Sequence, residues 1–223
     1  MSLKPLKKSD RNKVWMKKRQ DRPRLIQPEY HLIASEGVKT EPLYFNAIQK
    51  IINEKYRDRI QLKITGMGDN TTNLLEKAHR YVQNSGVVFK HVWIVYDTDN
   101  FPAEQINEVE RLCDVYSLQE ETTYHATWSN QCIELWYLLH FAYTDADVDR
   151  TFYWRKLTAA LNAIGKGDYY KNRPDMYAVL RPFIDTAIIN ARKLDKRNAG
   201  KVPSNAAPGT KVYELIEKLK PYL

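Results

Sequence analysis

The sequence has little cysteine and no long apolar run, and both absences exclude classes of protein. Its two cysteines, Cys113 and Cys132, form no CxxC pair and no Cys/His cluster at zinc spacing. Each lies among apolar residues, so we expect buried, reduced thiols. No apolar stretch reaches the roughly 18 residues of a transmembrane helix. The N-terminus is charged and lacks the apolar core of a signal peptide, so we expect a cytoplasmic protein with no membrane partner.

Several catalytic sequence motifs are also missing. The chain has no GxxxxGK(S/T) loop and no GxSxG turn, which excludes P-loop ATPases and hydrolases with a nucleophile elbow. The histidines show no HxxxH or HExxH spacing, so we do not expect any of them to bind a metal: His31, His79, His91, His125 and His140.

The net charge of +8 lies entirely in the first 25 residues, which hold ten basic and two acidic side chains. The rest of the chain is neutral. Such arms commonly contact the phosphates of nucleic acid, with an affinity that depends on salt and not on sequence. The alternative is a solvated tail that aids solubility. We therefore treat residues 1–27 as a basic arm and expect these residues to bind nucleic acid: Lys7, Lys8, Lys17, Lys18, Arg19, Arg22 and Arg24.

Hydrophobic periodicity predicts an α/β fold with a parallel sheet flanked by helices and a C-terminal helical extension. The expected strands are residues 29–34, 60–65, 92–96 and 122–127. The expected helices between and after them begin near residues 40, 71, 102 and 133. Only helices are expected after residue 149, at 150–164, 176–190 and 210–220, with a polar loop at 196–208. A change in composition near 145 predicts an α/β domain over residues 28–145 and a helical subdomain over 146–223.

Two acidic motifs each follow an apolar strand. Glu36 and Gly37 follow the first strand, and Asp97 and Asp99 follow the third. If these strands are parallel neighbours, the three carboxylates meet at the carboxyl edge of one sheet, where α/β proteins bind ligands. Crowded carboxylates repel unless a cation lies between them, and oxygen ligands suit Mg²⁺ or Mn²⁺. The alternatives are a plain turn after Glu36 and a solvated loop in which Asp99 caps a helix.

Two further residues could complete such a site. Lys39 lies near the start of a helix that Thr40 can cap, a position that favours anions. Glu134 lies inside an otherwise apolar helix, where a carboxylate is costly without a partner. If Asn130 caps that helix, its N-terminus faces the sheet edge. The alternative for Glu134 is a salt bridge to a basic side chain of the helical region.

These motifs together resemble the RloB family. Residues 35–45 (SEGVKTEPLYF), 95–99 (VYDTD) and 129–141 (SNQCIELWYLLHF) are similar to three segments of that family, with Gln131 in place of its usual proline. Tyr169, Lys171 and residues 205–219 are similar to its C-terminal pattern. The resemblance runs from about residue 28 to the end.

The resemblance implies a Toprim-related fold in a bacterial or archaeal protein, often encoded beside restriction–modification genes or an AAA-type ATPase. It also implies a role in phage defence through abortive infection. In Toprim domains the glutamate after the first strand and the DxD after the third serve catalysis and metal binding. By position these are Glu36, Asp97 and Asp99, and Glu134 is an additional acidic residue of this branch.

We therefore predict a Mg²⁺- or Mn²⁺-dependent phosphodiesterase, a nuclease acting on DNA or RNA. Asp97 and Asp99 hold the metal with Glu134, Glu36 binds a second metal or acts as general base, and Lys39 steadies the scissile phosphate. The alternative is a non-catalytic, nucleic-acid-binding partner of an AAA-type ATPase. A haloacid-dehalogenase-like phosphatase is disfavoured because Phe101 stands where that class has threonine, and a glycosyltransferase DxD site is equally disfavoured. The sequence leaves a homo-oligomer open.

Overall fold

The computed structural model describes residues 27–69, 71–98 and 101–223. Its centre is one five-stranded sheet with the order β2-β1-β3-β4-β5. The strands are β1 (Glu29–Ser35), β2 (Ile60–Gly66), β3 (Phe89–Asp97), β4 (Thr123–Asn130) and β5 (Gly209–Thr210). The first four are parallel, and β5 is antiparallel to β4.

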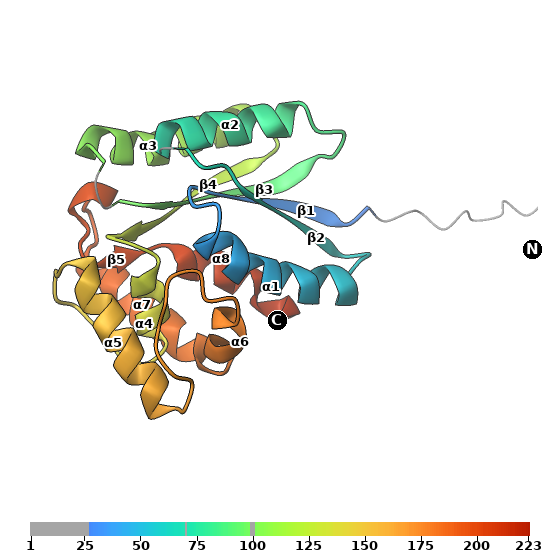
Figure 1. Cartoon of the computed structure of the whole chain (residues 1–223). Helices are drawn as coiled ribbons and strands as arrows, with labels where there is room; N and C mark the ends of the chain where they lie inside the picture. Colours follow the sequence, from blue (N-terminus) through green and yellow to red (C-terminus); the bar gives the residue numbers. More distant parts are fainter. Residues whose placement is uncertain (1–26, 70, 99–100) are drawn as a thin grey trace, which may run out of the picture.

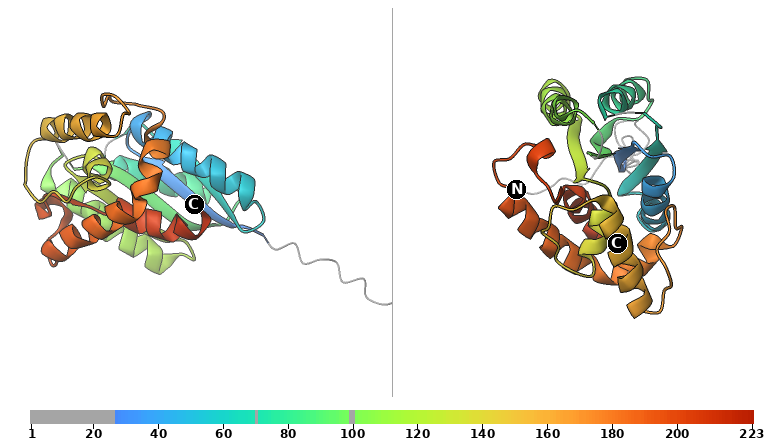
Figure 2. Two further views of the ribbon diagram at one scale, coloured as in Figure 1. Left: turned by 90° about the horizontal axis from the view of Figure 1, so that it is seen from below. Right: turned by 60° about the vertical axis from the view of Figure 1, so that its left-hand side comes forward.

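Helices cover both faces of the sheet (Figure 1). The helices are α1 (Thr40–Lys55), α2 (Thr71–Gln83), α3 (Ala103–Gln119), α4 (Glu134–Leu139), α5 (Arg150–Ala163), α6 (Met176–Leu180), α7 (Ile184–Arg197) and α8 (Val212–Leu219). Short 3₁₀ turns are η3 (Arg181–Phe183), η4 (Pro203–Asn205) and η5 (Lys220–Tyr222). Helices α2 and α3 lie side by side over one face, and α1 with the C-terminal helices lies over the other (Figure 1 and the right-hand view of Figure 2).

Burial on both faces explains why the central strands β1 and β3 contain almost continuous apolar runs. Along β1, Leu32 and Ala34 pack in the core beneath α2 and α3, whereas Ile33 packs in the core shared with α1 and the C-terminal helices. All three side chains are fully buried. Alternate residues of one strand therefore belong to two different cores, one on each side of the sheet.

The α/β fold with flanking helices and a C-terminal helical extension is confirmed. The domain boundary that we placed after residue 145 falls in residues 142–149, which form neither helix nor strand. One hydrophobic core runs from the sheet and α1 into α4, α5, α7 and α8. The C-terminal helices thus pack directly onto the sheet. The division into an α/β domain and a helical subdomain stays a prediction.

Three local expectations are wrong. Pro182 interrupts the helix expected over 176–190, because proline lacks the N–H that a helix interior needs, and a 3₁₀ turn separates α6 from α7. A short strand, β5, follows the loop where only helices were expected. Asn130 ends β4 instead of capping a helix, and its side-chain amide donates to the Pro203 carbonyl at 3.1 Å.

Within the ranges that the structure describes, no helix combines the length and the apolar character that crossing a bilayer requires.

Candidate functional site

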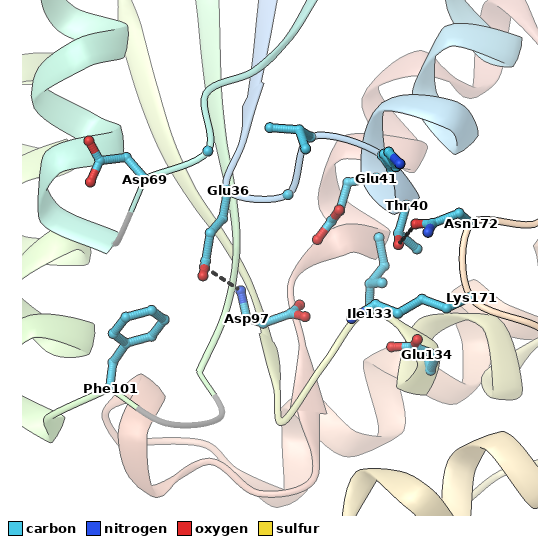
Figure 3. Close-up of a pocket in the computed structure, with 14 residues that line it drawn as sticks. Glu36, Thr40, Glu41, Asp69, Asp97, Phe101, Ile133, Glu134, Lys171 and Asn172 are labelled. Atoms are coloured by element: carbon cyan, nitrogen blue, oxygen red, sulfur yellow. Dashed lines mark hydrogen bonds between the residues drawn. The ribbon is translucent and has the colours of Figure 1, made fainter.

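A pocket of about 530 Å³ opens at the carboxyl edge of the parallel strands. Glu36 and Asp97 contribute side chains from the ends of β1 and β3, as Figure 3 shows. The N-terminal turn of α1, the start of α4 and a loop at residues 171–172 close it from the other side. The pocket therefore combines the post-strand motifs of the sheet with a segment of the helical extension.

The backbone around Glu36 is fixed from both neighbouring strands. The Glu36 N–H donates to the Val95 carbonyl at 2.9 Å, and the Gly68 N–H donates to the Glu36 carbonyl at 3.1 Å. Gly66 lets the chain after β2 approach this closely, since a Cβ there would lie 2.7 Å from the Gly37 oxygen and 2.8 Å from Val38 Cα. The position of Glu36 is thus set by the sheet.

Asp97 is the last residue of β3 and lies directly beside Glu36. Its backbone N–H donates a long hydrogen bond of 3.4 Å to Glu36 Oε2. Its own carboxylate points away from Glu36, towards Ile133 and Glu134 across the pocket (Figure 3). The structure therefore brings together the ends of β1 and β3, as the two motifs predicted, but the carboxylates of Glu36 and Asp97 point in different directions.

Glu134 also reaches this pocket, from the first turn of α4. Its side chain is buried, with 3% of the residue exposed, and the Tyr169 hydroxyl donates to its Oε1 at 2.8 Å. Among the residues described, Glu134 makes no salt bridge, so its partner is a tyrosine hydroxyl and not the basic side chain that the alternative required. The helix that carries Glu134 begins at the pocket although its N-cap is Ile133 and not Asn130.

Glu41 is a pocket residue that sequence reasoning missed. It lies in the first turn of α1 and is only 6% exposed, and a Cβ on Gly37 would lie 2.8 Å from its Cδ. Burial raises the pKa of the Glu41 carboxyl, the charge of Glu134 raises it further, and Lys171 partly opposes the shift. Because glutamate is common in the first turn of a helix, the residue type gave no reason to place Glu41 in the pocket, although it lies in the segment 35–45 that resembles the RloB family.

Two lysines line the same pocket. Lys39, the N-cap residue of α1, is exposed, and Lys171 comes from the C-terminal loop. Thr40 does not cap α1; its hydroxyl donates to Asn172 Oδ1 at 2.8 Å and so ties this loop to the helix. The helical extension therefore supplies a cation and a hydrogen-bonded wall to a site that begins on the sheet.

A family model described as RloB-like protein matches residues 31–219, nearly the whole chain. The chain belongs to the RloB-like family. The comparisons with curated proteins and with solved structures found no match. The pocket residues Glu36, Asp97 and Glu134 all lie within the matched range.

Not every predicted site residue of this RloB-like protein can be placed. The structure brings Glu36, Lys39, Asp97 and Glu134 to one pocket. Asp99 and the arm residues lie outside the described residues: Lys7, Lys8, Lys17, Lys18, Arg19, Arg22 and Arg24. The catalytic, metal-binding and nucleic-acid-binding roles of all of them stay predictions.

The residue types that line the RloB-like pocket are those that a hydrated Mg²⁺ ion takes as ligands. Magnesium in proteins takes oxygen ligands, usually one or two carboxylates, and keeps several waters. Glu36 and Asp97 offer two carboxylates from neighbouring strands. Within the described part of the chain, no three pocket carboxylates lie within 4.8 Å of one another, so this part alone does not form a closed cage.

Proposed function

We propose that this RloB-like protein is a Toprim-like, Mg²⁺-dependent phosphodiesterase that cleaves DNA or RNA in the cytoplasm as part of phage defence. The observation that supports this most is the pairing of Glu36 and Asp97 at the ends of adjacent parallel strands, in a pocket that Lys39 also lines. Carboxylates for a cation and a lysine for a phosphate are what metal-assisted phosphoryl transfer needs.

In this proposal Glu36 and Asp97 hold Mg²⁺ or Mn²⁺, with Asp99 and Glu134 as further oxygen ligands. When bound, the metal polarises a phosphoryl oxygen and lowers the pKa of a coordinated water. The carboxylate of Glu36 also suits a general base that takes the proton of the attacking water.

The remaining pocket residues orient and neutralise the substrate in this account. Lys39 lies at the N-terminus of α1, where free N–H groups and the helix dipole attract a phosphate. Tyr169 keeps the Glu134 carboxylate in one orientation through its 2.8 Å hydrogen bond. The wall formed by Lys171 and Asn172 adds a second cation beside the carboxylates.

A cleavage assay tests the proposal. The purified protein is incubated with Mg²⁺ or Mn²⁺ and with plasmid, single-stranded DNA and tRNA in parallel. We expect metal-dependent cleavage of at least one substrate and a loss of roughly 100-fold or more in Asp97→Asn, because a lost metal ligand removes several kcal/mol of transition-state stabilisation.

Asp114→Asn is the matched control, since Asp114 is an exposed carboxylate on α3 and does not line the pocket. Cleavage that survives in Asp97→Asn would point to a contaminant or another site. A wild type that cleaves none of the substrates but still binds nucleic acid would favour the other reading, a non-catalytic partner of an AAA-type ATPase.

A further inference from the structure

A second cluster of residues that can bind a metal lies at the opposite end of the strands from the acidic pocket. Glu29 and His31 are the first and third residues of β1, so their side chains share one face of the sheet. His91 on β3 is paired in register with His31. Strand β1 is seven residues long, so its two ends, one at this cluster and one at the pocket, lie about 20 Å apart.

The three side chains converge at distances close to those of a zinc site. Glu29 Oε1 lies 2.8 Å from His31 Nε2 and 3.6 Å from His91 Nε2. One ligand atom from each residue lies within 4.8 Å of the other two, and no other group of three such residues does so among those described. A tetrahedral Zn²⁺ with bonds of about 2.1 Å places its ligand atoms about 3.4 Å apart.

The two histidines of the cluster are largely buried and held in place, whereas the glutamate is exposed enough for an ion to reach it. The side chain of His31 is fully buried and that of His91 is 12% exposed, whereas that of Glu29 is 42% exposed. An ion can therefore enter from the Glu29 side without opening the core. Lys218 of α8 lies 3.9 Å from Glu29 Oε1, so a cationic side chain already faces this carboxylate.

A supporting shell surrounds the two histidines. His91 Nδ1 lies 2.9 Å from His125 Nε2. When His91 Nδ1–H donates this hydrogen bond to His125 Nε2, the lone pair of His91 Nε2 is available to bind a cation. Trp93 stacks on His125 with ring centroids 3.8 Å apart and donates a long hydrogen bond of 3.4 Å to His31 Nδ1. Metal binding through His31 Nε2 moves the ring proton to Nδ1 and breaks that bond, so Trp93 should sense the ion.

We propose that Glu29, His31 and His91 bind one divalent transition-metal ion of the Zn²⁺ class, with water or an incoming group at the fourth position. Two imidazoles and one carboxylate suit zinc and not Mg²⁺. The ligands are not predictable from sequence spacing, because the two histidines are separated along the chain and meet only through the pairing of β1 with β3. This site is independent of the phosphodiesterase proposal.

Zinc titration of the full-length, chelator-treated protein tests the site, with free Zn²⁺ read by competition against a chromogenic chelator. We expect one site in wild type and affinity at least tenfold weaker in His91→Ala and in Glu29→Gln. His125→Gln should weaken binding by roughly 10–100-fold, the usual effect of removing a residue that orients a ligand. His79→Ala is the control, because His79 lies on α2 and stacks on Tyr116, and its affinity should equal that of wild type.

Tetrahedral coordination is tested separately with Co²⁺, which should give intense visible absorption in wild type and none in His91→Ala. His31 is left intact because it is fully buried, whereas Glu29→Gln changes only a partly exposed group, so we expect this variant to keep the fold. A wild type that binds no zinc, or one whose affinity is unchanged in both His91→Ala and Glu29→Gln, would overturn the proposal and leave a buried hydrogen-bond network. This test uses Zn²⁺ and Co²⁺, whereas the test of the acidic pocket uses Mg²⁺. The two proposals can therefore fail independently of each other.

Discussion

At the scale of single residues, the pocket gathers several carboxylates at one edge of the sheet. Glu41 and Glu134 are both buried, and the charge of Glu134 adds to the burial that raises the pKa of Glu41. Lys171 offsets only part of this. A group whose pKa is raised in the folded state binds its proton more tightly there than in the unfolded chain. Glu41 therefore favours folding below its ordinary pKa of 4.5 and costs stability as the pH rises above that value.

Replacing Glu41 by Gln should raise the stability of the protein near pH 8 in chelator, because the amide keeps the shape of the side chain and removes the buried charge. The gain over wild type should shrink as the pH falls towards 4.5. Urea unfolding at several pH values measures it, with Glu54→Gln on the exposed face of the same helix as the control. A gain that does not vary with pH would show that the charge of Glu41 is not its source.

The residues that sequence reasoning found and missed differ in a physical way. Glu36 and Asp97 directly follow apolar strands, so the strand pattern alone places them at a sheet edge. Tyr169, which holds Glu134, comes from a loop 35 positions away, and only the packing of the extension brings the two together. Glu41 resembles an ordinary first-turn glutamate until its burial is known.

At the scale of secondary-structure elements, the turns after β1 and β2 interlock. The Met67 and Gly68 N–H groups donate to the carbonyls of Ser35 and Glu36, and Gly66 leaves room for this approach. β1 and β3 were predictable because each is a buried apolar run, and β2 because its apolar and polar residues alternate. The two residues of β5 were not predictable, because the loop that brings them beside β4 shows no hydrophobic periodicity.

Gly66→Ala should destabilise the protein by about 1–3 kcal/mol, because the added methyl would overlap backbone atoms that cannot rotate away. Gly86→Ala is the matched control: a Cβ there meets nothing within 4 Å, so its stability should change by no more than about 0.5 kcal/mol. Chemical denaturation of both variants measures the difference. Equal stability of the two variants would contradict the close approach of the two turns.

At the scale of the whole molecule, the net positive charge and the two candidate sites lie in different parts of the chain. The net charge of +8 belongs to the first 25 residues, while the body from Pro28 onward is neutral. The parallel order of β1, β3 and β4 places the carboxylate pocket at one end of the sheet and the histidine cluster at the other. Fold class was predictable because alternating strands and helices permit few topologies.

If the arm supplies the phosphate contacts, deleting residues 1–25 should flatten the dependence of nucleic-acid affinity on salt. Each lost phosphate contact lowers the slope of log affinity against log salt by roughly 0.7–0.9. Fluorescence anisotropy with a labelled oligonucleotide at several salt concentrations measures the slope. An unchanged slope would show that the body carries these contacts.

The most direct test of the account is whether Mg²⁺ binds the pocket formed by Glu36 and Asp97. Thermal unfolding of chelator-treated protein is followed with and without Mg²⁺, for wild type, Glu36→Gln, Asp97→Asn and the control Asp114→Asn. Wild type and the control should gain stability on adding Mg²⁺, by about 2.7 kcal/mol at 100 times the dissociation constant, and the two pocket variants should gain much less. Equal gains in all four proteins, or no gain in wild type, would contradict a cation site at this edge of the sheet.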